Sequence, residues 1–311
     1  MSDLTSFNPK NSLILYEIDD KLDFLIKLHT YKKLPKVLML SGDKGIGKYT
    51  LINHFMNFIY DNQNYNFENK TISKDSIFSK HNLNNTFPNI IYLSGSNYKN
   101  IKIEDIRNLK ANLLKTTILN KERFIILDDV ELFSLNSMNA LLKIIEEPSL
   151  RDYFILINSK TKPLIETIYS RSLELKVTLQ NNTRIKIIEI LIKNDKLDTL
   201  IDYKIINLSP GNFLSFNEIL SGNKIDINGK FLLNLEKILN LYKKNKNIDF
   251  INLILFITEY YFSNLIKKNS KNIEQIIENK SFVIDNINNF VIYNLNQNSL
   301  INSINNKIFN E

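Results

Sequence analysis

Residues 41–50 read SGDKGIGKYT, and this stretch decides how the first part of the chain folds. Gly42, Gly47 and Lys48 satisfy the spacing G-x-x-x-x-G-K of a phosphate-binding loop. In such a loop the backbone N–H groups converge on phosphates and the lysine supplies a positive charge. The chain has only seven glycines, and Gly45 is a third one within the loop. The sequence therefore predicts a loop shaped for phosphate.

The last position of the motif departs from the pattern. Tyr49 stands where a serine or threonine hydroxyl normally holds magnesium, and its phenol oxygen lies several ångströms farther from the backbone. Thr50 follows one residue too late, because on a helix it points about 100° away. ATP with magnesium is the cofactor that the loop implies, but the missing hydroxyl counts against ordinary magnesium chemistry.

Apolar periodicity around the loop predicts a strand before it and a helix after it. The run KVLML (36–40) is typical of a buried strand, and KYTLINHFMNFIYDN (48–62) places Leu51, Phe55 and Phe58 on one helical face. Strand, glycine loop and helix in this order form the context that a phosphate loop needs.

The alternation of strands and helices continues to about residue 178. Further strands are expected at NIIYLS (89–94), RFIILDD (123–129) and YFILINS (153–159), each followed by a helical pattern. Such alternation implies a parallel sheet covered on both faces. We therefore predict an α/β fold. The polar, asparagine-rich stretch 61–88 interrupts the pattern and is expected to be a surface connection or insertion.

Beyond residue 178 the strand signals fade. Short helices are expected at 184–194, 197–208 and 212–220, with SPGN (209–212) as a turn, and FVIYNL (290–295) is ambiguous between strand and helix. Longer helical patterns fill the rest of the chain.

These patterns suggest boundaries near residues 178 and 225. The regions predicted are an α/β module at 1–178, a small helical region at 179–225 and an all-helical region at 226–311.

Composition limits the class of protein. With 311 residues and 43% hydrophobic content the chain can bury packed cores, and no run of about 18 apolar residues or leader-like N-terminus is visible. We therefore expect a cytoplasmic protein with no membrane partner. The net charge of +7 permits binding to nucleic acid or an acidic partner, although lysines on a solvated face explain it equally well. The chain has no cysteine and three scattered histidines, so no zinc or other structural metal is expected.

Three further positions carry residue types that suit phosphoryl transfer. Asp128 and Asp129 end the third predicted strand, where one acid could hold magnesium and the next could orient a water, or where they could simply cap a helix. Arg171 is one of only five arginines; taken alone, it is best interpreted as a surface ion-pair residue.

Several segments together resemble one family. They are GDKGIGK, IKIEDIRNL, RFIILDDVELFSLNSMNALLKIIEEPS, YFILINSKTKPLIETIYSRS and LSPGNFL, and the block N-A-L-L-K-x-x-E-E-P at 139–148 is the most specific. In order and spacing they resemble the bacterial clamp-loader subunits of DNA polymerase III, most of all the delta-prime subunit. The resemblance implies a AAA+ P-loop module, a helical lid at 179–225 and a C-terminal helical collar at 226–311 that joins a hetero-pentameric ring.

The resemblance also implies roles for single residues. The family's S-R-C motif matches residues 170–172, so Arg171 would act in trans as an arginine finger in a neighbouring ATPase, a role worth roughly 10³ to 10⁵ in rate. Asn158 matches the family's sensor position, and Asn212 stands near the turn where hydrolysing members have a second sensor arginine. Many relatives carry a four-cysteine zinc module, which is absent here; the stretch 61–88 lies in its place.

These features lead to a main hypothesis and two alternatives. The main one is a delta-prime-like stator that contacts the delta and gamma/tau subunits and helps to load the sliding clamp onto primed DNA, with little or no ATPase activity of its own. One alternative is a hydrolysing gamma/tau-like ATPase that uses Thr50 or a water as the magnesium ligand. The other is a AAA+ protein of DNA repair or regulation.

Overall fold

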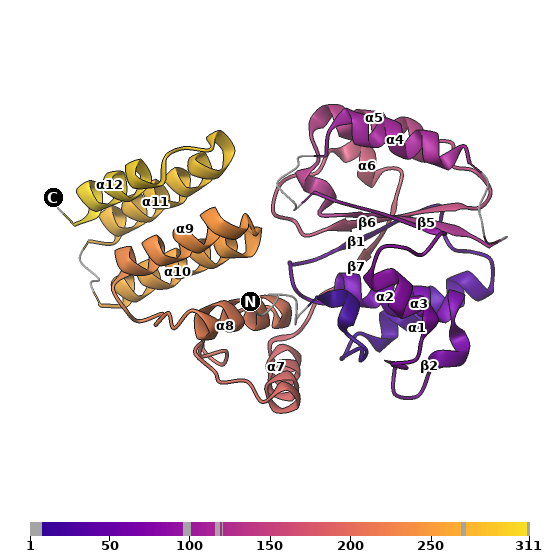
Figure 1. The fold of residues 1–311 in the computed structure, drawn as a ribbon, viewed down its shortest axis with the longest axis horizontal. Helices are drawn as coiled ribbons and strands as arrows, with labels where there is room; N and C mark the ends of the chain where they lie inside the picture. The colour runs from indigo at the N-terminus through magenta and orange to yellow at the C-terminus, as the bar shows by residue number, and fades with distance from the viewer. Residues whose placement is uncertain (1–7, 96–100, 116–118, 120, 269–271, 310–311) are drawn as a thin grey trace. The chain divides into compact units, whose positions relative to one another are not determined.

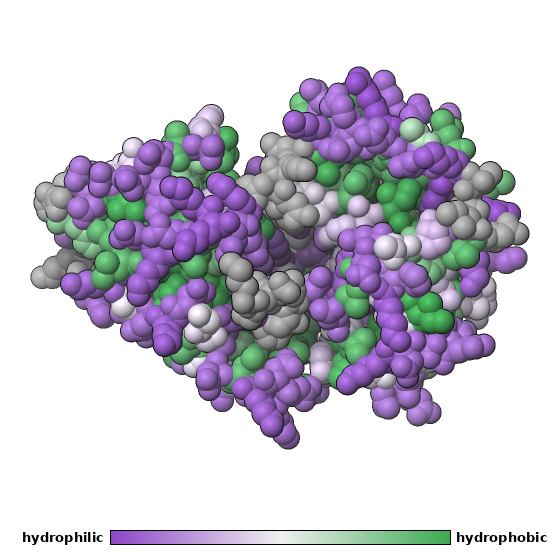
Figure 2. Space-filling model, viewed as in Figure 1, coloured by the Kyte–Doolittle hydropathy of each residue, from purple (hydrophilic) through white to green (hydrophobic). Residues whose placement is uncertain are grey.

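The structure is a computed structural model that describes residues 8–95, 101–115, 119, 121–268 and 272–309. It divides into two compact units (Figure 1). The first unit runs to Leu197 and also includes Tyr203–Leu214, and the second comprises Asp198–Asp202 and the chain from Ser215 onward. The region boundaries near 178 and 225 remain predictions. On the face shown in Figure 2, hydrophilic side chains cover most of both units, as their lysine and asparagine content leads one to expect.

The first unit is built on a parallel five-stranded sheet in the order β4-β5-β6-β1-β7. The strands are β1 (Val37–Ser41), β4 (Ile90–Ser94), β5 (Arg123–Asp128), β6 (Asp152–Asn158) and β7 (Leu173–Lys176). The central strands are buried along most of their length because helices cover both of their faces. The predicted α/β fold is confirmed. The sequence patterns had not indicated β7, which pairs with β1 at the sheet edge.

Helices cover both faces of this sheet (Figure 1). On one face lie α1 (Asp19–Thr30), α2 (Lys48–Tyr60) and α3 (Ile77–Leu83); on the other lie α4 (Ile103–Leu113), α5 (Leu135–Ile145) and α6 (Glu166–Tyr169). Each face has its own buried cluster of apolar side chains.

The stretch 61–88, expected to be a surface connection or insertion, is folded. It holds a small antiparallel pair, β2 (Tyr65–Asn66) with β3 (Thr71–Ile72), followed by α3. Phe78 is buried and its ring stacks on Tyr60 of α2, with 5.5 Å between the ring centroids. A few apolar anchors thus fix a segment whose composition is mostly polar.

After β7 the described chain is helical. The helices are α7 (Asn181–Asp195), α8 (Pro210–Gly222), α9 (Phe231–Asn245), α10 (Ile248–Lys268), α11 (Ile273–Tyr293) and α12 (Gln297–Ile308). In the second unit α10 packs against α9 and α11, and α12 packs against both α11 and α9. Within the described ranges, no helix is long and apolar enough to cross a membrane.

FVIYNL (290–295) was ambiguous between strand and helix, and its first four residues form the end of α11, which runs to Tyr293. Two other predictions for this region were wrong in detail. The stretch 197–208 contains turns rather than a helix. SPGN is not a separate turn, because Pro210 already begins α8, and proline suits a first helical position.

Several helices end without the usual glycine. The residues that follow α7, α9 and α11 are Lys196, Lys246 and Asn294, and each has a left-handed backbone with φ near 50°. Each donates its backbone N–H to a carbonyl of the preceding turn. Glycine is the usual residue at such positions because it has no Cβ to strain.

Candidate functional site

The phosphate loop connects β1 to α2, as predicted. Gly45 and Gly47 have φ of 81° and 97°, which glycine adopts more easily than any other residue. Gly42 has a φ of 151°, and a Cβ there would lie 2.1 Å from the carbonyl oxygen of Val177, beyond β7. The loop therefore depends on its glycines for close backbone packing as well as for conformation.

Lys48, the lysine of the loop, is buried, and its amine is turned back onto the loop. Nζ donates to the backbone oxygens of Gly42 at 2.6 Å and Asp43 at 2.8 Å. Burial lowers the pKa of Lys48 to about 8, although the nearby carboxylates, Asp128 foremost, oppose the shift. Backbone oxygens and nearby carboxylates of the same chain thus already stabilise the positive charge of Lys48.

The crest of the loop is covered by the start of α8. Ser209 Oγ donates to the carbonyl oxygen of Lys44 at 2.6 Å, and the N–H of Gly211 donates to the carbonyl oxygen of Gly45 at 2.8 Å. A Cβ on Gly211 would lie within 3 Å of Gly45 backbone atoms, so the two segments meet backbone to backbone. Sequence patterns did not indicate this contact, which joins residues far apart in the chain.

A hollow of about 420 Å³ lies beside the loop, within the first unit. Its lining includes the basic side chains Lys44, Lys160 and Arg184. Arg184 is buried and donates to the carbonyl oxygens of Leu208 at 3.1 Å and Tyr203 at 2.9 Å, and burial lowers the pKa of its guanidinium. Arg184 was missed from the sequence, where nothing but the scarcity of arginine marked it.

Tyr49 belongs to the hydrophobic core instead of the loop. Its ring packs edge-on against Tyr92 of β4 with 5.5 Å between centroids, and burial raises the pKa of Tyr49. Thr50, the alternative magnesium ligand, is half-buried in the first turn of α2. The structure thus places the Tyr49 side chain inside the protein, and in the part of the chain that it describes the Thr50 side chain has no hydrogen bond that would aim it at the loop.

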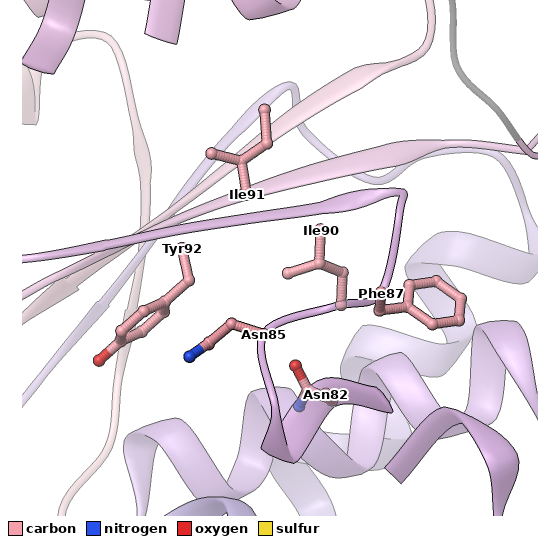
Figure 3. Close-up of a pocket in the computed structure, with 6 residues that line it drawn as sticks. All are labelled: Asn82, Asn85, Phe87, Ile90, Ile91 and Tyr92. Carbon is pink, nitrogen blue, oxygen red and sulfur yellow. The ribbon is translucent and has the colours of Figure 1, made fainter. Parts of the chain in front are cut away.

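Lys10 completes the surroundings of the two tyrosines and was not singled out from the sequence. Its amine lies 4.5 Å from the centroid of the Tyr92 ring and donates to the carbonyl oxygen of Asn82 at 3.4 Å and to Asn85 Oδ1. Tyr92 and Asn85 line a cavity of about 230 Å³ on this side of β4, while Ile91 points to the other side of the strand (Figure 3). Burial lowers the pKa of Lys10, and the charge of Asp128 opposes this.

Asp128 ends β5 and is held by two hydrogen bonds. The Tyr92 hydroxyl donates to Oδ2 at 2.8 Å, and the N–H of Asp129 donates to Oδ1 at 3.0 Å. Burial, with the neighbouring charge of Asp129, raises the pKa of Asp128 to about 6. The strand β6 separates β5 from β1, so Asp128 does not adjoin the phosphate-loop strand.

Asp129 and Glu131 connect the end of β5 to the segment after β6. Asp129 has a left-handed backbone and accepts a hydrogen bond from Ser159 Oγ at 2.8 Å, and it caps no helix with its side chain. Glu131 Oε1 accepts from Thr161 Oγ1 at 2.9 Å and from the N–H of Ser159 at 3.1 Å. Glu131 Oε2 is buried without a hydrogen-bond partner among the described residues. Glu131 was missed from the sequence because it follows the strand by three residues.

Asn158 ends β6 directly beside the loop. Its backbone oxygen accepts from the N–H of Gly42 at 3.2 Å. Its side chain is engaged elsewhere, since Nδ2 donates to the Tyr169 hydroxyl at 3.1 Å and Oδ1 accepts from the N–H of Lys160 at 2.8 Å. The amide therefore faces α6 and the chain that follows β6.

Arg171 follows α6 and lies at the surface. Its Nε and Nη2 are 2.9 Å and 2.7 Å from Glu146 Oε1, and Nη1 donates to the carbonyl oxygen of Thr167 at 3.1 Å. Its side chain keeps 37% of its exposure. The simple interpretation as an ion-pair residue thus holds for the single chain, and it leaves the guanidinium accessible from outside.

The parallel sheet, the glycine loop after β1 and the acids at the end of β5 define an α/β module of the P-loop kind, followed by helices. A family model described as "DNA polymerase III, delta subunit" matches residues 19–181, just over half of the chain. The chain therefore belongs to this family of DNA polymerase III clamp-loader subunits.

Individual relatives carry related names. The chain is 26% identical over 165 residues to the DNA polymerase III subunit gamma of Buchnera aphidicola subsp. Acyrthosiphon pisum. The aligned region covers 52% of this chain and 44% of that one. The chain is 33% identical over 76 residues to the delta-prime subunit of Pseudomonas aeruginosa, over 24% of this chain and 23% of that one. The matches thus span less than half the length of these relatives.

One solved structure is similar over most of the chain. It is the crystal structure of a DNA polymerase III, gamma subunit-related protein from Thermotoga maritima, with 15% sequence identity and a TM-score of 0.47, and the match covers 90% of this chain and 96% of that one.

Proposed function

We propose that this protein is a delta-prime-like stator of the bacterial clamp loader. It would sit in a five-subunit ring in the cytoplasm, contact the delta and gamma/tau subunits, and help to load the sliding clamp onto primed DNA. Membership of the DNA polymerase III family supports the setting. The choice of a stator over a hydrolysing subunit rests on how the chain treats its own phosphate loop.

One observation carries this choice. At the position of the magnesium-binding hydroxyl, Tyr49 is buried against Tyr92, and Tyr92 in turn donates its hydroxyl to Asp128. The residue at the hydroxyl position and the acid at the end of β5 are thus both engaged by Tyr92, the first through ring packing and the second through a hydrogen bond. A magnesium ion would need a serine or threonine hydroxyl at position 49, where the phenol of Tyr49 is buried instead, and the Asp128 carboxylate to which Tyr92 donates.

The remaining groups support the same interpretation. The amine of Lys48 is bound to Gly42 and Asp43, and the crest carbonyls of Lys44 and Gly45 accept hydrogen bonds from the start of α8. The glycines fit a phosphate cradle, but the donor set does not fit magnesium–ATP. We therefore derive no step of ATP hydrolysis at this loop.

Arg171 supports the other half of the proposal. An arginine finger must project from the surface of one subunit and reach the phosphates of another, where its planar fork stabilises developing charge. Arg171 is the exposed arginine of the S-R-S sequence at 170–172 and is presented at the end of α6. In the proposed ring it would complete the ATP site of an adjacent gamma/tau subunit.

The first experiment separates a stator from an ATPase. The isolated protein is mixed with magnesium–ATP, and turnover and binding are compared with those of Lys48→Ala. We expect no turnover above this control. Turnover that Lys48→Ala abolishes would establish the alternative, a gamma/tau-like ATPase with Thr50 or a water at the metal.

The second experiment tests the finger within the complex. The loader is reconstituted with cognate gamma/tau and delta subunits, and DNA-dependent ATP turnover and clamp loading are measured for Arg171→Ala. The matched control is Arg107→Ala, since Arg107 is also exposed and paired with a glutamate, Glu104. Loss of both activities only in Arg171→Ala is expected, and wild-type activity in that variant contradicts the proposal. A chain that does not assemble with these subunits would favour a repair or regulatory role.

A further inference from the structure

Near the end of the block at 139–148, just before Pro148, stand two adjacent glutamates with different contacts. Glu146 follows α5 and contacts both Nε and Nη2 of Arg171 with one carboxylate oxygen. Glu147 is exposed and forms no ion pair among the described residues. The two side chains share charge, exposure and place in the chain, so they make a matched pair for experiment.

Glu146 is one of two anchors on the guanidinium group. The other is the end of α6, where Nη1 donates to the carbonyl oxygen of Thr167 at 3.1 Å and to Ser170 Oγ at 3.3 Å. The group is therefore held from α5 on one side and from α6 on the other. An arginine side chain held at both ends of its fork has a defined direction, although it is more than one-third exposed.

This arrangement matters because a free arginine side chain is costly to order. Immobilising such a chain costs rotamer entropy, and a functional group acts best when supporting residues fix it beforehand. An exposed ion pair, by contrast, adds little to the stability of the fold. The contact with Glu146 is thus better suited to orient Arg171 than to stabilise the fold.

We propose that Glu146 is a positioning residue that holds the Arg171 guanidinium ready for the phosphates of a neighbouring nucleotide site. The inference rests on the proposed function of Arg171 as a trans arginine finger, and it gives Glu146 a role that acts through that residue alone. It also gives a physical reason for the first glutamate of the E-E-P sequence, which the phosphate loop does not use.

The test uses the reconstituted loader with Glu146→Ala and Glu147→Ala, each with and without Arg171→Ala. We expect Glu146→Ala to lower kcat of ATP turnover about two- to fivefold with KM for ATP unchanged, because the finger acts on charge that develops in the transition state. Glu147→Ala should match wild type. In the Arg171→Ala background, Glu146→Ala should cause no further loss.

The outcomes separate this inference from the proposed function. If Arg171→Ala alone leaves turnover unchanged, the finger role fails and the positioning role falls with it. If Arg171→Ala is impaired but Glu146→Ala is not, only the positioning role is overturned. A loss from Glu146→Ala that persists in the Arg171→Ala background, or that Glu147→Ala reproduces, also overturns it. Urea unfolding of the free chains checks that both variants fold.

Discussion

The phosphate loop and the end of α6 lie in the same unit, and each presents a basic residue suited to phosphate. At the loop, Lys48 is buried and bound to backbone oxygens of its own chain. At the end of α6, Arg171 is exposed and paired with a surface glutamate. The first cation is sequestered by the fold, and the second is presented by it.

This difference teaches how a nucleotide-binding fold can be retained without its own chemistry. Glycines, strand and helix keep the loop in shape, while the groups of the magnesium site pack into the core. Substitutions in the loop should therefore change stability, whereas substitutions at the end of α6 should change the rate of a partner. The following experiments can break or sharpen that division.

The largest effect is expected at Arg171. In the reconstituted loader, Arg171→Ala should slow turnover at the neighbouring site by roughly 10³, the lower end of the range for an arginine finger. In the free chain the same change should lower the free energy of unfolding by less than about 1 kcal/mol, because the ion pair with Glu146 is exposed. Urea titration and single-turnover ATPase assays measure the two. A stability loss much above that limit would make Arg171 a structural residue.

The next effect is expected at Gly42. Replacement by alanine should destabilise the nucleotide-free chain by roughly 2–4 kcal/mol, because the backbone φ is unfavourable and the new Cβ would meet Val177. Gly222→Ala is the control, since no atom lies within 4 Å of its Cβ position. Equal unfolding midpoints for the two variants would show that the loop does not depend on close backbone packing.

A smaller effect concerns pH. The pKa of Asp128 is about 6 in the folded chain against an ordinary value of 3.8, so the folded state binds more protons between these values. Stability is then fully present below about pH 4 and falls, by up to roughly 3 kcal/mol, as pH rises through 6. Asp128→Asn should flatten this part of the curve from urea titrations. Asp75→Asn, at an exposed acid, should not.

The smallest effect is expected at Tyr92. Its hydroxyl donates to the carboxylate of Asp128, which favours the charged form, so Tyr92→Phe should raise the pKa of Asp128 further. The change should also cost about 1 kcal/mol of stability for the lost hydrogen bond. Carbon NMR of the carboxyl group, titrated with pH, measures the shift. Tyr153→Phe serves as control because Tyr153 stacks on Phe124 instead. An unchanged pKa would mean that Tyr92 does not control this acid.

The local parts of this picture could be predicted from the sequence. Strand, glycine loop and α2 follow one another within a short span, so spacing and periodicity were enough to identify them. The small sheet and α3 could not, because mostly polar residues separate the few buried anchors Tyr65, Ile72 and Phe78. At the end of α11 the aromatic and β-branched residues of FVIY (290–293) resembled a strand, although Ile287 and Phe290 fall on one buried helical face.

The connections within the site could not be predicted, because they join distant parts of the chain. Tyr92 reaches Asp128 only when β4 and β5 pair in the sheet. Lys10 reaches the rings of Tyr49 and Tyr92 only when the N-terminal turn packs beside them. Glu146 and Arg171 meet only when α5 and α6 lie on the same face of the sheet. No short motif contains either pair, so the sequence allowed single site residues to be identified but not the residues that they contact.

The left-handed residues that follow α7, α9 and α11 have a practical consequence. A lysine or asparagine in this conformation costs roughly 1 kcal/mol more than glycine would. Replacing Lys196, Lys246 and Asn294 by glycine should therefore raise the free energy of unfolding by about 3 kcal/mol in total. These positions lie outside the loop and apart from Arg171 in the sequence. Glycine at these three points would give a sturdier protein for reconstitution, one in which weakened loop or finger variants still fold.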